Sequence, residues 1–157
     1  MKLRISTLSR MFSTLFIFSM LTAFSLFVTI DVAHAKELKN QIDTKALADK
    51  MVNHFIKKEF TEGMALAKPH WPLPEVELDN LIKKIEMQWP VVDRRFGPSV
   101  GQEMVDKQKI GDSFLRYYYL HKFKNHAIYW KITFYKPEKT WVVNGVSFKD
   151  NLDILYK

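Results

Sequence analysis

Three side chains that could act together in catalysis lie close together in this chain: Tyr117, Tyr119 and His121. A spacing of two residues places them on one face of a β-strand. A general base must accept a proton near the operating pH, and of these three side chains only histidine does so. One hypothesis is therefore an enzyme that uses His121 with Tyr117 or Tyr119. The alternative is a half-buried histidine held by hydrogen bonds.

Aromatic side chains exceed what one small core requires, and they favour binding over turnover. Tyr117, Tyr119, His121 and Trp130, with Asn144 from a later segment, are candidates to line an apolar pocket with a polar rim. Such a pocket suits a small hydrophobic or amphipathic ligand.

The remaining tyrosines offer a second kind of binding. Tyr118, Tyr129 and Tyr135 alternate with the pocket candidates and would face outward. They could form a sheet surface for an envelope protein or for a second copy of the chain, as in a homodimer. An aromatic, basic sheet also suits nucleic acid, but export and the lack of an RNA-binding motif argue against it.

No further catalytic or metal-binding pattern is present in the sequence. The chain contains no cysteine, which excludes disulfides, thiolate zinc sites and a cysteine nucleophile. Phosphate-binding, dinucleotide-binding, zinc-protease and hydrolase motifs are absent as well. His121 and His126 have no carboxylate near them in the sequence and make a poor metal site. We therefore expect a non-catalytic protein without cofactor or metal.

The candidate residues belong to a carboxyl-terminal half that is typical of one antiparallel sheet. Apolar and aromatic segments separated by turn residues predict four strands, Glu103–Ile110, Ser113–Phe123, Ala127–Tyr135 and Trp141–Phe148. The first of these is the most charged, and we expect it at an edge of the sheet.

The second and third segments predict a β-hairpin with a defined inner face. Apolar residues occupy odd positions within Leu115–Phe123 and even positions within Ile128–Phe134. A two- or four-residue loop around Lys124-Asn125 pairs positions of opposite parity, such as Tyr119 with Trp130. The two faces therefore agree. A five-residue loop after the third segment would also place Asn144 inside, close to Trp130 or Ile132.

Apolar residues at helical spacing predict two to three helices before the sheet. The first begins at Asp43 or Thr44, either of which could cap it, and its apolar face runs along Leu47–Phe55. Thr61–Ala67 predicts a short second helix.

Prolines separate the second helix from a third. Three prolines lie within Lys68–Pro74, so this stretch cannot be regular helix. We interpret His70-Trp71 as a plug over the end of the core rather than as a lid. Pro74 suits the first turn of the next helix, which Pro90 either ends or kinks.

The amino terminus is typical of a secretory signal. A basic start is followed by an uncharged apolar run, Met11–Ile30, and then by Ala33-His34-Ala35. This pattern predicts cleavage before Lys36 and a periplasmic or secreted location. The alternative is an uncleaved membrane anchor, since about 20 apolar residues also span a bilayer.

The net charge is a weaker guide to partners. The signal segment carries three basic residues and one acidic residue, so its removal lowers the net charge from +7 to +5. A basic balance favours anionic partners. The basic residues are scattered, however, and a solvated surface explains them.

Helices followed by a meander that ends in Trp141–Asp150 resemble the nuclear transport factor 2-like superfamily, with its cystatin-like α+β fold, and more narrowly its small exported bacterial domains of unknown function. The resemblance covers the chain from about Thr44. It implies a cone with helices against a curved sheet, and its enzymes, isomerases or dehydratases, use a carboxylate base with a tyrosine or a histidine–aspartate pair. This chain places no Asp or Glu on the predicted inner face, which puts such catalysis in doubt.

We therefore predict an α+β fold, with two to three amino-terminal helices packed on a curved antiparallel sheet of about four strands. Residues 36–157 would form this single domain after a signal sequence of residues 1–35.

Overall fold

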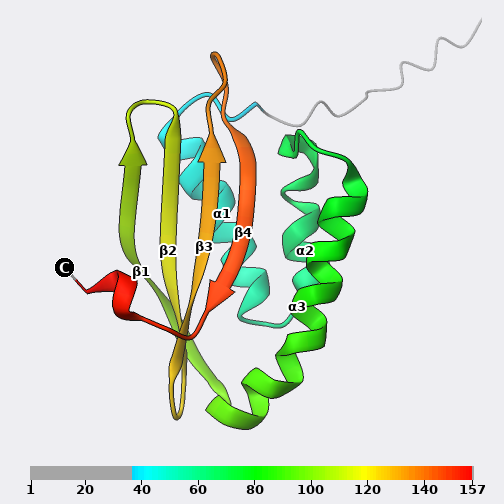
Figure 1. The fold of residues 1–157 in the computed structure, drawn as a ribbon, viewed down its shortest axis with the longest axis vertical. Coiled ribbons are helices and arrows are strands. Elements are labelled where there is room, and N and C mark those ends of the chain that lie inside the picture. The colour runs from blue at the N-terminus through cyan, green and yellow to red at the C-terminus, as the bar shows by residue number, and fades with distance from the viewer. Residues whose placement is uncertain (1–36, 157) are drawn as a thin grey trace, which may run out of the picture. The chain divides into compact units, whose positions relative to one another are not determined.

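The computed structural model describes residues 37–156, and within them it contains three α-helices followed by a four-stranded antiparallel sheet. The elements are α1 (Gln41–Phe55), α2 (Phe60–Ala65), η1 (Lys68–His70), α3 (Glu75–Phe96), β1 (Ser99–Ile110), β2 (Phe114–Phe123), β3 (Ala127–Tyr135), β4 (Val142–Lys149) and η2 (Asp153–Leu155). The predicted α+β class is confirmed (Figure 1). The proposed signal sequence and its cleavage site lie outside the described residues.

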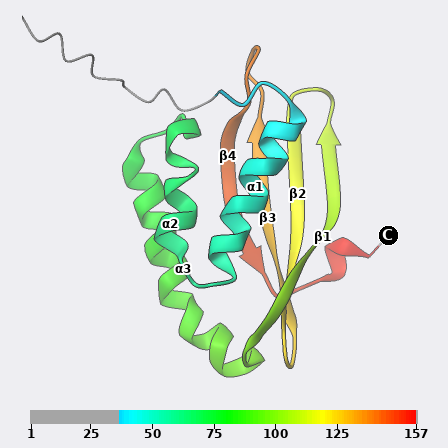
Figure 2. The same ribbon diagram turned by 180° about the vertical axis from the view of Figure 1, so that it is seen from behind.

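The helices cover one face of the sheet and continue past one of its edges. The strands are ordered β1-β2-β3-β4, so β1 and β4 are the edges. The prediction that the first strand lies at an edge is therefore confirmed. Helix α1 lies across β2 and β3, whereas α2 and α3 stand on the side of β4 (Figure 2). The carboxyl-terminal segment with η2 crosses the opposite face (Figure 1).

The β2–β3 hairpin has the predicted register. Tyr119 pairs with Trp130 and His121 pairs with Ile128. All four side chains are at most 1% exposed. The predicted inner face of the hairpin is thus confirmed, because side chains directly opposite each other in an antiparallel pair lie on the same face.

The outer strands depart from the predicted pattern at β-bulges. Strand β1 begins at Ser99 rather than Glu103 and has irregularities between Ser99 and Gly101 and between Met104 and Asp106. In β4, Thr133 pairs with Gly145 and Phe134 with Val143, so Asn144 is an extra residue. Asn144 is exposed, and its predicted inner position is wrong because a bulge reverses the parity of a strand.

Helix α1 begins earlier than predicted. The side chain of Asn40 accepts hydrogen bonds from the backbone N–H groups of Ile42 and Asp43, at 2.8 and 2.9 Å. Asn40 is therefore the cap, and neither Asp43 nor Thr44 takes that role. The predicted apolar face is confirmed, since Leu47, Ala48, Met51, Val52 and Phe55 are buried.

Helix α3 continues past Pro90 to Phe96. Proline lacks the N–H that would bond the carbonyl one turn before it, and α3 changes direction in its last turns (Figures 1 and 2). Burial of Trp89, Val92 and Phe96 on both sides of Pro90 holds the last turns in place. Gly97 then ends the helix with a φ of 80°, which glycine adopts without strain.

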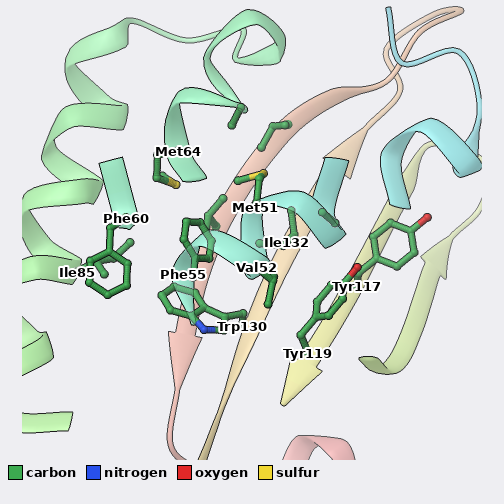
Figure 3. Packing of buried hydrophobic residues seen from close by; sticks show 14 of the residues in the cluster. Met51, Val52, Phe55, Phe60, Met64, Ile85, Tyr117, Tyr119, Trp130 and Ile132 are labelled. Carbon is green, nitrogen blue, oxygen red and sulfur yellow. The ribbon is translucent and has the colours of Figure 1, made fainter. Parts of the chain in front are cut away.

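Aromatic rings fill the space between the helices and the sheet. The ring of Phe55 lies 4.5 Å from that of Trp130, and Phe60 lies 4.6 Å from Trp89. Figure 3 shows Phe55, Phe60 and Trp130 gathered between α1, α2 and the sheet. Trp71 also packs against this core, which supports its interpretation as a plug.

Candidate functional site

The two predicted pocket tyrosines fasten α1 to β2. The hydroxyl of Tyr117 donates to the carbonyl of Gln41 at 3.0 Å and lies 3.0 Å from Thr44 Oγ1. The hydroxyl of Tyr119 donates to Asp49 Oδ1 at 2.7 Å. Burial raises the pKa of both hydroxyls, and for Tyr119 the bond to Asp49 adds to this. Both groups therefore stay protonated and act as hydrogen-bonded ties between helix and strand. Figure 3 shows the two side chains on β2.

His121 is fully buried and engaged through both ring nitrogens. Trp130 Nε1 donates to His121 Nδ1 at 3.5 Å, so Nε2 carries the proton and donates to Ser99 Oγ at 2.8 Å. The imidazole also stacks on Trp89 and Phe123, with centroids 5.7 and 4.2 Å away. Burial lowers its pKa to about 4. These contacts favour a structural role for His121 over that of a general base.

Trp130 occupies the middle of the interior where the sequence placed a pocket. It is 0% exposed, as are Leu115 and Phe134 on the same face of the sheet. The structure brings Trp130 against His121, whereas Asn144 lies outside this group. The hollows described next for residues 37–156 are lined by other side chains.

A groove runs between α3 and β4. A hollow of about 390 Å³ lies between the second half of α3 and the end of β4. A neighbouring hollow of about 240 Å³ extends toward the start of α3 and shares Gln88, Phe148 and Lys149 with the first. We call the two together the α3–β4 groove. Its helix side includes Leu81, Lys84, Met87, Gln88, Val91 and Arg95, and its sheet side includes Ile128 of β3, Ser147–Lys149 of β4 and the following Asp150.

Apolar side chains are exposed along this groove. Met87 is 79% exposed and Val91, one helical turn further, is 50% exposed. Opposite them is Phe148, whose ring lies 5.9 Å from that of the buried Trp89. The α3 backbone packs closely on α2 and less closely on β4, so these aromatic rings span the distance between helix and strand. Exposed apolar groups gathered in a concave site are typical of ligand-binding surfaces.

The groove has a positive rim. Lys84, Arg95 and Lys149 contribute three cations, and Asp150 is the one acidic residue among the lining residues. Arg95 Nη1 lies 3.4 Å from Asp150 Oδ2, and both side chains are at least half exposed. The remaining positive charge favours a ligand that carries negative charge.

The edge of β4 borders the same groove. Within residues 37–156, β4 pairs with β3 alone, and before its start the N–H of Trp141 donates to the carbonyl of Leu38 at 2.8 Å. From Gly145 to Lys149 the pairing with β3 is regular. An edge strand presents unpaired N–H and C=O groups along its free side.

The groove was not predicted from the sequence, because it brings together residues that are about 60 positions apart in the chain. One feature of the sequence could have indicated the groove. Met87 and Val91 are apolar and one turn apart, but they lie off the buried face of α3 that carries Ile85, Trp89 and Val92. A second apolar pair on an amphipathic helix indicates that something other than the core contacts it.

No family model, no curated protein and no solved structure matches the chain.

Among the helices of residues 37–156, none combines the length and the apolar character needed to cross a bilayer. The same stretch contains no group of three His, Asp or Glu side chains placed to hold a metal ion.

Proposed function

We propose that residues 37–156 form a non-catalytic binding domain whose ligand occupies the α3–β4 groove and combines an apolar part with negative charge. The observation that carries this proposal is the exposure of Met87 and Val91 opposite Phe148, below a rim with three cations and one carboxylate. Apolar contact would supply affinity, and the rim would orient the charged part of the ligand.

The proposal keeps the kind of function expected from the sequence and moves its site. The interior between α1 and the sheet is occupied by Phe55, Phe60 and Trp130. Enzymatic use of His121 gains no support, because both of its ring nitrogens have partners and its side chain is fully buried.

We further propose that the protein acts in the periplasm or after secretion, and that it is related to the nuclear transport factor 2-like superfamily. The basic start, the apolar run Met11–Ile30 and Ala33-His34-Ala35 support export. Helices that precede a four-stranded meander support the relationship. A reporter enzyme that is active only outside the cytoplasm, fused after residue 40, tests the location.

The binding site is tested with 8-anilinonaphthalene-1-sulfonate, a probe that is apolar, carries one negative charge and fluoresces in apolar sites. We expect saturable binding by the purified protein and its loss in Val91→Asp, which puts a carboxylate into the groove. Val76→Asp is the matched control, because Val76 is also an exposed valine of α3, at 59%, but does not line the groove. Equal binding by the two variants, or no saturable binding at all, would contradict the proposal.

A further inference from the structure

We propose that the ligand of the α3–β4 groove is an extended acidic peptide segment of a partner protein, which pairs with Gly145–Lys149 as a fifth strand of the sheet. This inference rests on the proposed function of the groove. It adds the chemical class of the ligand and the way in which the main chain of β4 recognises it.

The free edge of β4 supplies the main-chain part of the recognition. Gly145–Lys149 pairs regularly with β3 on one side, and within this segment Ser147, Phe148 and Lys149 line the groove. Extended peptides commonly bind by adding a strand to such an edge, where backbone hydrogen bonds give affinity and pockets for alternate side chains give specificity.

The two edges of the sheet differ in how well they would accept a strand. Strand β1 carries two irregularities and two lysines, Lys107 and Lys109, and both features discourage pairing with another chain. Strand β4 has one irregularity, at Asn144, and is regular beyond it. The last three residues of this regular part, Ser147–Lys149, border the groove, so the edge suited to pairing reaches the apolar surface.

A neighbouring strand would fit the position of the groove. Added strands lie about 4.8 Å from their partner, and their side chains alternate between two faces. On the face shared with Phe148, alternate residues of the peptide would meet Gln88 and Val91 of α3. On the other face they would lie next to Ser147 and Lys149, which follow the opposite parity in β4. The groove therefore favours a peptide with an apolar residue at every second position.

The charge around the groove selects the residues between the apolar ones. Lys84, Arg95 and Lys149 are balanced by Asp150 alone among the residues that line the groove. Glutamate or aspartate at the polar positions of the peptide would complement this rim, whereas lysine or arginine would be repelled.

The test selects peptides from a random displayed library of 12-residue sequences on the purified protein, with counter-selection on Val91→Asp. We expect the selected sequences to alternate apolar residues with polar ones and to be enriched in acidic residues. One selected peptide is then synthesised in three forms: unmodified, N-methylated at its even residues, and N-methylated at its odd residues.

Strand addition predicts that the two N-methylated peptides differ. In a strand the N–H groups of successive residues point to opposite sides, so only one of the two forms loses the hydrogen bonds to β4. We expect that form to bind at least about tenfold more weakly than the unmodified peptide, since tenfold corresponds to little more than one net hydrogen bond. The other form should bind within about twofold of it. Two N-methylated forms that bind equally would overturn the proposal.

The outcomes also separate this inference from the proposed function. If no peptide distinguishes the protein from Val91→Asp, while the anilinonaphthalene probe does, the groove binds an apolar anion but not a strand. If the probe does not distinguish them either, the groove is not the site. A third result is a dimer in sedimentation that Val91→Asp dissociates and that no peptide disrupts. That result would assign the β4 edge to a second copy of the chain and would also overturn the proposal.

Discussion

Tyr119 Oη donates a hydrogen bond to Asp49 Oδ1 across 2.7 Å, and so joins the middle of β2 to α1. The tyrosine is 1% exposed, whereas the Asp49 side chain is 38% exposed and also pairs with Lys45. A residue that sequence analysis proposed for a pocket is thus part of the contact that holds a helix on the sheet.

Removing this hydroxyl should destabilise the fold and leave binding intact. Tyr119→Phe loses a hydrogen bond to a charged acceptor, and because Asp49 is partly exposed we expect a loss of about 1 kcal/mol in the free energy of unfolding. Urea denaturation measures it. Tyr156→Phe is the control, since Tyr156 is 79% exposed and should show no change. Equal effects of the two substitutions would rule out the proposed role of Tyr119.

Gly63 is required by the close approach of α2 to α1. A Cβ at Gly63 would lie 2.5 Å from Phe55 Cε1, closer than two carbon atoms can pack. We expect Gly63→Ala to destabilise the protein by about 1–3 kcal/mol, although alanine favours helix more than glycine does. At Gly145 a Cβ would meet nothing within 4 Å, so Gly145→Ala serves as the control. Thermal unfolding of both variants should separate them clearly, and the prediction fails if Gly63→Ala is the more stable.

Acid should destabilise the protein through His121. Burial holds the pKa of His121 at about 4, below the value of about 6.5 in an unfolded chain. Between these values the unfolded state binds a proton that the folded state does not. The destabilisation through His121 is therefore small above pH 6.5, and the free energy of unfolding falls by about 3 kcal/mol as the pH decreases to 4.

The variant His121→Gln isolates this effect. Burial also lowers the pKa of His70, which acts in the same direction, so the slope of the wild-type protein alone is not sufficient. Glutamine does not titrate, and the stability of the variant should depend less on pH between 6.5 and 4. The comparison uses the two slopes, because the variant also loses the hydrogen bonds to Ser99 and Trp130. Parallel profiles would show that His121 titrates normally.

Arg95 should contribute to binding more than to folding. Its ion pair with Asp150 is exposed, and its guanidinium lies 5.0 Å from the centre of the Phe96 ring. Exposed contacts of both kinds stabilise proteins little, so Arg95→Ala should change the free energy of unfolding by less than about 1 kcal/mol. The same substitution should weaken binding of 8-anilinonaphthalene-1-sulfonate, because it removes a cation from the rim of the groove. Arg94→Ala is the matched control, as Arg94 does not line the groove. Fluorescence titration should find weaker binding only for Arg95→Ala.

The central hairpin was predictable because its two strands give independent indications of one inner face. Alternation in Leu115–Phe123 and in Ile128–Phe134 fixes a parity for each strand, and the short loop between them fixes how they pair. The class and the order of the elements follow from the same kind of local pattern. The apolar face of α1 was predictable from the helical spacing of its apolar residues.

Features that depend on one backbone irregularity were not predictable. Asn144 is exposed because a bulge adds one residue to β4, and alternation in a strand that is apolar on both faces does not reveal such a bulge.

The residue that caps α1 was not predictable either. Asn40 is the cap rather than Asp43 or Thr44. Each of these three residues can cap a helix, and the sequence alone does not rank them.

The kind of ligand expected from the sequence stays a prediction, and the position of the groove now proposed for it could not be predicted. Abundant aromatic residues indicated binding, and the positive net charge was compatible with an anionic ligand. The α3–β4 groove, however, depends on how far α3 stands from the edge of the sheet, where Trp89 of α3 contacts Phe148 of β4. A contact between residues so distant in the chain leaves no local pattern.

Amide hydrogen exchange of β4, with and without a selected peptide, tests the central claim most directly. If the ligand pairs with the free edge in the groove, the peptide should slow amide exchange at alternate residues of Gly145–Lys149. Exchange in β2, which lies away from this edge, should stay unchanged. If exchange in Gly145–Lys149 stays the same while the peptide is bound, the peptide does not pair with β4, and strand addition at this edge is contradicted.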